Sequence, residues 1–193
     1  TDPTAPILSL PADIVAEATG PGGATVEFTA TATDIVDGAV PVTCAPPSGS
    51  VFPLGETTVN CSAVNSGGTE TQGSFKVTVT DTTAPVLTLP ADIVTEATSL
   101  DGATVEFTAT ATDIVDGAVP VTCVPPSGSV FPLGETTVNC SAVDAAGNPA
   151  QGSFKVTVTD PTAPILSLPA DIVAEATGPG GATVEFTATA TDI

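Results

Sequence analysis

The chain has 193 residues, with 22 acidic side chains against two Lys and no Arg, which gives a formal net charge of −20 at pH 7. This charge excludes binding to nucleic acid and to anionic membrane surfaces, because both need a basic protein surface. The chain has no His, Met, Trp or Tyr, so the usual general base and most transition-metal sites are excluded too. No apolar run reaches the roughly 18 residues that a membrane-spanning helix needs, so we expect no membrane insertion.

An internal repeat with a period of 79 residues organises the sequence, and its two full copies differ at 14 of 79 aligned positions. The stretch at 2–35 recurs without change at 160–193. Because the first residue is Thr and no signal peptide is evident, we expect a mature product or a fragment. The expected units are repeat 1 at 1–81, repeat 2 at 82–160 and a partial third repeat at 161–193, completed by further chain or by another subunit.

Taken in chain order, each unit begins with a D-x-T-A-P linker and continues with β patterns. Residues 24–33 alternate between apolar and polar side chains, and residues 57–64 and 74–80 do the same, which indicates half-buried strands. The 19 Pro and 18 Gly interrupt every window of helical length. Short strands separated by turn signals predict an all-β sandwich. In repeat 1 the strands are expected near residues 6–10, 13–18, 24–33, 40–44, 50–54, 57–64 and 74–80.

Each full repeat carries one pair of cysteines, 17 residues apart. Because the chain has no His and no C-x-x-C spacing, the pairs favour disulfides and therefore an oxidising, extracellular setting over buried thiols. Closing a loop of this length contributes about 3 kcal/mol through chain entropy. The predicted bonds, Cys44–Cys61 and Cys123–Cys140, would join neighbouring strands of one sheet.

Both full repeats resemble the hyalin repeat (HYR) domain in the ordered runs D-x-T-A-P, L-P-A-D-I, A-T-D-I-V-D-G, V-P-V-T-C, P-P-S-G-S-V-F-P-L-G-E-T-T-V-N-C-S-A-V and G-S-F-K-V-T-V-T-D. The resemblance implies a linear array of tandem immunoglobulin-like sandwiches in extracellular adhesion, matrix or surface proteins. The family usually has an outer cysteine pair as well. Its places here hold Leu10 and Gly73, and Leu89 and Gly152. We therefore expect mobile domain ends unless another contact clamps them.

Aspartates recur in the linkers and in the two loops expected at the same end of each sandwich. Several carboxylate and carbonyl oxygens suit Ca²⁺, and an ion at each inter-repeat linker would stiffen the joint. The alternative is that these residues shape turns through Asx hydrogen bonds. Asn65 replaces Asp144 in repeat 1, which would weaken that site. The possible ligands are Asp2, Asp34, Asp37, Asp81, Asp113, Asp116, Asp144, Asp160 and Asp192.

We find no catalytic constellation and expect no enzyme activity, since the Ser and Thr hydroxyls have no evident base. Asn60 and Asn139 each begin an N-C-S sequon, which is formally an N-glycosylation site. The middle residue of each sequon is an expected disulfide cysteine on a strand, which is a poor context for glycosylation.

The expected function is structural: a disulfide-stapled spacer in an extracellular or cell-surface filament, stalk or matrix fibre. Its expected partners are neighbouring identical repeats or subunits. One alternative is an adhesive module that recognises a protein or a glycan, although the Tyr, Trp and Arg common in binding sites are absent. Another alternative is a filament subunit assembled by strand complementation.

Overall fold

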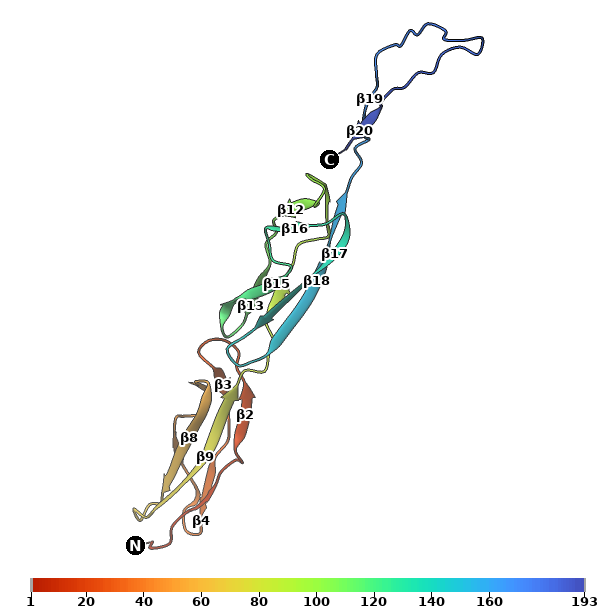
Figure 1. Cartoon of the computed structure of the whole chain (residues 1–193). Coiled ribbons are helices and arrows are strands. Elements are labelled where there is room, and N and C mark those ends of the chain that lie inside the picture. The colour runs from red at the N-terminus through yellow and green to blue at the C-terminus, as the bar shows by residue number, and fades with distance from the viewer. Residues whose placement is uncertain (1, 193) are drawn as a thin grey trace. The chain divides into compact units, whose positions relative to one another are not determined.

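The computed structural model describes residues 2–192, and strands and turns make up its regular structure, with no helix among those residues (Figure 1). Repeat 1 contains β1 (Ile7–Ser9), β2 (Ile14–Glu17), β3 (Ala24–Val26), β4 (Thr31–Asp34), β5 (Gly38–Val40), β6 (Val42–Ala45), β7 (Ser50–Phe52), β8 (Gly55–Val64) and β9 (Glu70–Thr80). Repeat 2 contains β10 (Val86–Thr88), β11 (Ile93–Glu96), β12 (Ala103–Val105), β13 (Thr110–Asp113), β14 (Gly117–Val119), β15 (Val121–Val124), β16 (Ser129–Phe131), β17 (Gly134–Val143) and β18 (Pro149–Thr159). The remaining strands are β19 (Ile165–Ser167) and β20 (Thr189–Thr191).

Each full repeat is a two-layered β-sandwich. In repeat 1, the sheet β1-β4-β5 and the pair β3-β7 form one layer, and the sheet β2-β9-β8-β6 forms the other. Repeat 2 has the same order in β10-β13-β14, β12-β16 and β11-β18-β17-β15. The pair β2–β9 is parallel, with Ile14 opposite Val77, whereas β8 and β9 are antiparallel. The prediction of an all-β, immunoglobulin-like sandwich is confirmed.

Apolar side chains from both layers meet in one core in each repeat. Phe52 from one layer and Val59 and Val77 from the other are fully buried, and repeat 2 buries the equivalent residues. The Phe28 ring packs edge-on against Phe75, with ring centroids 4.9 Å apart. Burying each such side chain contributes about 1.5–3 kcal/mol, so the core provides the main stabilisation of each sandwich.

Two disulfides each join neighbouring strands of a single sheet. Cys44 on β6 lies directly opposite Cys61 on β8, with their Cα atoms 4.0 Å apart. Cys123 and Cys140 form the same bond in repeat 2, with a Cα–Cα distance of 4.1 Å. Each bond thus links two adjacent strands of one layer, and neither bond crosses the core to the other layer.

The prediction of a continuous strand at 24–33 is wrong, because residues 27–30 belong to no strand and separate β3 from β4. In this gap the N–H of Phe28 donates to the Ser48 hydroxyl (2.8 Å), and the N–H of Gly49 donates to the Val26 carbonyl (2.9 Å). The loop after β6 therefore takes the hydrogen bonds that a continuous strand would have made.

The expected strand at 40–44 is also divided. Pro41 has no N–H to give to a ladder, and the chain changes layers there, since β5 pairs with β4 while β6 pairs with β8. The last strand is longer than expected, because β9 begins at Glu70.

The domain end that lacks the outer cysteine pair is clamped by packing and hydrogen bonds. Leu10 lies against Gly73, where its Cδ1 would be 2.9 Å from a Cβ built on the glycine. The Thr71 hydroxyl also donates to the Pro6 carbonyl (2.6 Å). A leucine side chain over a glycine therefore fills the space of the missing bridge in repeat 1.

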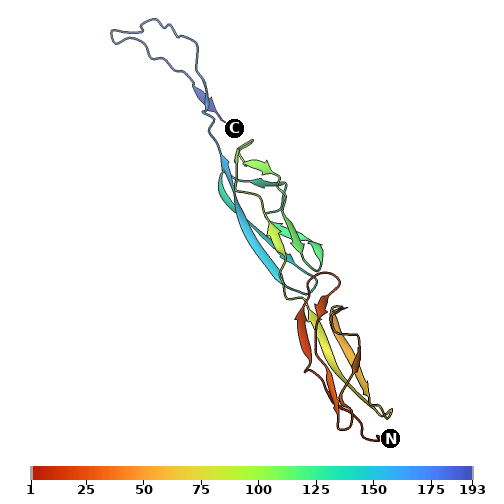
Figure 2. The ribbon, with the colours of Figure 1, turned by 180° about the vertical axis from the view of Figure 1, so that it is seen from behind.

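The third segment keeps one pair of strands, β19 and β20, and the rest of it is an open loop (Figures 1 and 2). Its sequence repeats 2–35, yet Val184 is 42% exposed where Val26 is 6% exposed, and Phe186 is 68% exposed. The partners of β2 and β3 in repeat 1 are β9 and β7, which the third segment does not contain. Within residues 161–192, the strand pair β19–β20 forms because both of its members lie inside the segment.

The chain divides into two compact units. One consists of Thr1–Thr88, Thr110–Val121 and Ser141–Gln151, and the other consists of Leu89–Ala109, Thr122–Cys140 and Gly152–Ile193. Over residues 2–192 there is no helix long and apolar enough to cross a membrane.

Candidate cation-binding sites

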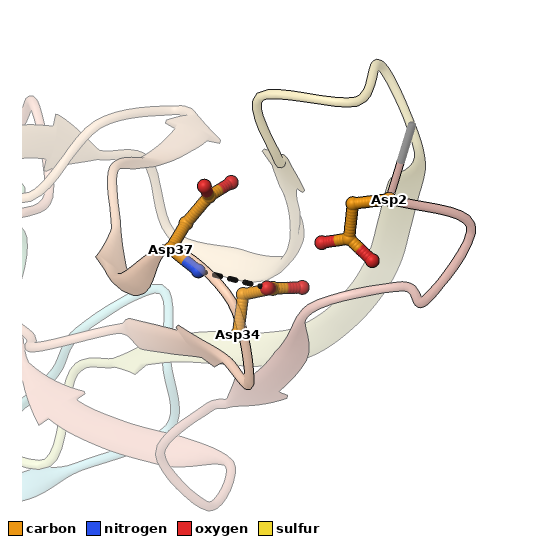
Figure 3. A group of neighbouring side chains, drawn as sticks. All are labelled: Asp2, Asp34 and Asp37. Carbon is orange, nitrogen blue, oxygen red and sulfur yellow. Dashed lines mark hydrogen bonds between the residues drawn. The ribbon is translucent and has the colours of Figure 1, made fainter.

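Site 1 consists of Asp2, Asp34 and Asp37. Asp2 lies in the linker, Asp34 ends β4, and Asp37 lies in the turn that follows (Figure 3). One carboxylate oxygen of each lies within 4.8 Å of the others. Asp34 Oδ1 accepts the N–H groups of Val36 (2.8 Å) and Asp37 (3.1 Å), and these bonds lower the pKa of Asp34. This is the predicted Asx turn.

The loop between β8 and β9 supplies donors to the remaining oxygens of site 1. Asn65 Nδ2 donates to the Thr4 carbonyl (2.6 Å) and to Asp2 Oδ2 (3.1 Å), and it lies 3.5 Å from Asp34 Oδ2, at the limit of a hydrogen bond. Ser66 donates to both oxygens of Asp37, through its N–H (2.6 Å) and through its hydroxyl (2.8 Å). An amide and a hydroxyl therefore supply donors to the acidic cluster of repeat 1.

Gly67 of the same loop lies against the backbone of Asp2, so closely that a Cβ at this position would collide with the Asp2 carbonyl oxygen. The equivalent residue in repeat 2 is Ala146. The loop of repeat 2 therefore cannot approach its linker in the same way without a shift.

Site 2 consists of Asp81, Asp113, Asp116 and Asp144, all within the first compact unit. One oxygen each of Asp81, Asp116 and Asp144 lies within 4.8 Å of the others. Asp113 repeats the turn of Asp34, since its Oδ1 accepts the N–H groups of Val115 (2.7 Å) and Asp116 (3.1 Å). Site 2 thus has one carboxylate more than site 1.

The loop between β17 and β18 donates less to the carboxylates of site 2. Asp144 stands in the place of Asn65, and Ala145 in the place of Ser66. The N–H of Ala145 donates to Asp116 Oδ2 (2.8 Å). Alanine has no hydroxyl to offer the other oxygen, so the second Ser66 bond has no counterpart.

The amide of Asn148 binds Asp144 and the linker backbone. Its N–H and its Nδ2 donate to the two oxygens of Asp144 (2.7 and 2.8 Å), and Nδ2 also donates to the carbonyls of Asp81 (3.2 Å) and Thr83 (3.3 Å). Burial opposes ionisation of Asp144, but the hydrogen bonds from Asn148 and from the backbone N–H groups of Gly147 and Ala146 together outweigh it and lower the pKa of Asp144. Asp144 is therefore a buried carboxylate held in its charged form.

Two oxygens of site 2 are buried and accept no hydrogen bond from residues 2–192: Asp81 Oδ2 and Asp113 Oδ2. The whole Asp113 residue is only 8% exposed. Burial raises the pKa of Asp81, and the nearby charges of Asp113, Asp144 and Glu17 raise it further. Unpaired buried acceptors are rare, and each costs about 1–3 kcal/mol.

The third segment brings no comparable cluster together. Asp160 Oδ1 accepts the N–H of Thr162 (3.0 Å), as in the other linkers. Over residues 2–192, neither Asp160 nor Asp192 joins a group of three like those of sites 1 and 2. Asn60 and Asn139, the sequon residues, are exposed on β8 and β17, and their glycosylation stays a prediction.

Three residues donate to these sites in ways that the sequence did not predict: Asn65, Ser66 and Asn148. A signal was available in the sequence, because six of the 14 differences between the two full repeats lie in this loop. What each amide and hydroxyl contacts required the structure.

The HYR domain family matches the chain twice, at residues 1–79 and 80–158. The chain belongs to the HYR domain family. Its similar proteins include hyalin of Lytechinus variegatus, 33% identical over 183 residues that cover 89% of the chain. Hyalin of Strongylocentrotus purpuratus is 31% identical over 205 residues that cover all of it. The chain spans about a third of the first hyalin and a sixth of the second, since it covers 34% and 17% of them. These HYR repeats are extracellular or cell-surface, adhesion-related modules.

Solved structures similar to this HYR pair include two cadherin ectodomains. The protocadherin GammaB4 extracellular domain gives a TM-score of 0.40 at 16% identity, over 95% of this chain and 37% of that one. Drosophila N-cadherin EC1-4 gives 0.37 at 15% identity, over 81% and 50%. Because both TM-scores are below 0.5, the description of this HYR fold rests on its own strands and sheets.

Proposed function

We propose that this chain is a structural segment of an extracellular filament, stalk or matrix fibre, in which each HYR domain is a disulfide-stapled spacer. The observation that carries the proposal is the parallel pairing of β2 with β9, from Ile14–Val77 to Glu17–Thr80. Because an early strand and the last strand run in the same direction, the chain enters a repeat at one end and leaves it at the other. A module of this topology adds length with every copy.

The dimensions and the sequence support a spacer. β9 has 11 residues, which at about 3.3 Å per residue span roughly 36 Å. Near-identical units suit a quasi-one-dimensional array in which each unit contacts its neighbours. In this role the chain catalyses no reaction, and the partners of each repeat are further repeats of the same kind.

Arrays of two, four and eight full repeats test the spacer role by electron microscopy and small-angle scattering. We expect the maximum dimension to grow by about 35–40 Å per repeat, as the strand rise requires. A dimension that grows only as the cube root of the mass, as for a compact assembly, would refute it.

A second candidate role, assembly by strand complementation, is favoured by the apolar side chains that the third segment exposes. Ile165, Leu168 and Val173 are 73%, 68% and 96% exposed. Strands equivalent to β6–β9 from another subunit would cover them. Sedimentation equilibrium of residues 1–193 beside residues 1–160 tests this: self-association confined to the longer chain supports complementation, and two monomers refute it.

A further inference from the structure

The two acidic sites differ in three corresponding oxygens. In site 1, Asn65 Nδ2 faces Asp2 Oδ2 and Asp34 Oδ2, and the Ser66 hydroxyl donates to Asp37 Oδ1. In site 2 the corresponding oxygens are Asp81 Oδ2, Asp113 Oδ2 and Asp116 Oδ1. The first two are buried without a partner among the residues described, and the third faces a loop residue with no hydroxyl.

We propose that site 2 binds one Ca²⁺ ion through Asp81, Asp113, Asp116 and Asp144, and that site 1 binds none because the Asn65 amide and the Ser66 hydroxyl stand in the ion's place.

The buried Oδ2 of Asp113 is the observation that separates this site from an ordinary acidic surface. A carboxylate oxygen withdrawn from water and given no donor loses its hydration without compensation. Asp81 Oδ2 is a second such oxygen among the four carboxylates of site 2. A divalent cation would supply the missing partner for both oxygens and offset the mutual repulsion of the four charges.

The number of carboxylates favours calcium over magnesium. Ca²⁺ binds oxygens at about 2.3–2.6 Å, so ligands on opposite sides of the ion lie roughly 4.6–5.2 Å apart. The oxygens of Asp81, Asp116 and Asp144 lie within 4.8 Å of one another. Mg²⁺ is usually bound through one or two carboxylates and keeps several waters, whereas site 2 has four carboxylates.

The loop substitutions explain why one repeat binds and the other does not. Repeat 2 has Asp144 where repeat 1 has Asn65, so a carboxylate that can bind the ion replaces an amide that donates hydrogen bonds. Repeat 2 also has Ala145 where repeat 1 has Ser66, so the hydroxyl donor is absent. Both amides donate to the linker backbone, Asn65 to the Thr4 carbonyl and Asn148 to those of Asp81 and Thr83. They differ in the carboxylate that they bind, which is Asp2 for Asn65 and Asp144 for Asn148. The linker and turn carboxylates thus stay available.

The test exchanges the two loops, because the chain itself provides a matched control. Isothermal titration of chelator-treated protein with CaCl₂ is expected to show one site per chain, with a dissociation constant of about 10⁻⁴–10⁻³ M as in other extracellular modules. Replacing D-A-A-G-N-P-A at 144–150 with N-S-G-G-T-E-T from 65–71 should abolish the heat. The reciprocal replacement in repeat 1, with Gly67 kept because a Cβ there would collide with the Asp2 carbonyl oxygen, should raise the stoichiometry to two.

Each loop already occurs on one of two sandwiches that are identical at 65 of 79 positions, so each variant keeps a loop that this fold carries. Circular dichroism and the Tm in EDTA check folding. We expect calcium to raise the Tm of the natural chain and not that of the 144–150 variant. MgCl₂ at the same concentration should give less heat. No calcium heat, two sites in the natural chain, or binding that survives the loop exchange would each overturn the proposal. This outcome is independent of the array lengths that test the spacer role.

Discussion

At the residue scale, one carboxylate holds the chain that leaves repeat 1. Glu17, at the end of β2, accepts hydrogen bonds from the N–H and the hydroxyl of Thr82 (both 2.8 Å) and from the hydroxyl of Thr83 (2.9 Å). The Thr82 bonds, followed by that from the Thr83 hydroxyl, lower the pKa of Glu17 below 4.5. In the next linker, Pro161 takes the place of Thr82, and proline offers neither donor.

We predict that T82P raises the pKa of Glu17 towards 4.5, and that T82V, which keeps the N–H, raises it less. Because the pKa is depressed in the folded state, the stabilisation by Glu17 is complete above about pH 4.5 and is lost as the pH falls through the folded pKa. Carboxyl ¹³C shifts measured against pH report the change. An unchanged Glu17 titration in T82P would show that these bonds do not hold the linker.

At the element scale, the in-sheet disulfide should stabilise its own repeat only. Replacing Cys44 and Cys61 with Ala removes a 17-residue closure, and we expect the free energy of unfolding of repeat 1 to fall by about 3 kcal/mol. Calorimetry would show one transition moving down. Repeat 2, with its bond intact, is the internal control, and a parallel shift of both transitions would contradict this independence.

The contact of Leu10 with Gly73 predicts where another bridge can be built. L10C/G73C should form a disulfide, because the two side chains would then meet where the leucine now packs. Closing this long loop should raise the free energy of unfolding by up to about 4 kcal/mol. Mass spectrometry and the Tm with and without reductant measure it. The single variant G73A, which keeps Leu10, should be less stable because its added methyl group crowds the leucine side chain. Free thiols in L10C/G73C would contradict the expected contact between the two positions.

Local alternation was enough to predict most strands, while long-range hydrogen bonds were not visible in it. The break at 27–30 depends on the Ser48 hydroxyl, 20 residues away. The division at Pro41 could have been predicted, since a proline cannot donate to a ladder. The meeting of linker and loop aspartates followed from the topology, but the bonds from Asn65 and Asn148 did not. The two amides share the linker carbonyl of Thr4 or Thr83 and differ in the carboxylate that they bind.

At the scale of the whole molecule, identical sequence adopts two states. Residues 2–35 are packed, whereas residues 160–192 expose Phe186 and Val184. We predict that appending the sequence of residues 36–80 after Ile193 completes the third sandwich. Calorimetry should then show a further transition, and any self-association of the 193-residue chain should disappear. If the third segment stays unfolded after these residues are appended, the prediction is contradicted.

The in-sheet position of the disulfide has a consequence for synthesis. The first 35 residues of a repeat have no partners for β2 and β3 until the rest of that repeat has emerged, and a neighbouring repeat offers nearly the same strands. Exchange of segments between neighbours is a characteristic error of repeat proteins. The Cys44–Cys61 bond lies wholly within the later half of its repeat, so it can close without capturing a borrowed first half. A wrongly paired β1–β4 segment is therefore held by no covalent bond and remains free to return to its own repeat.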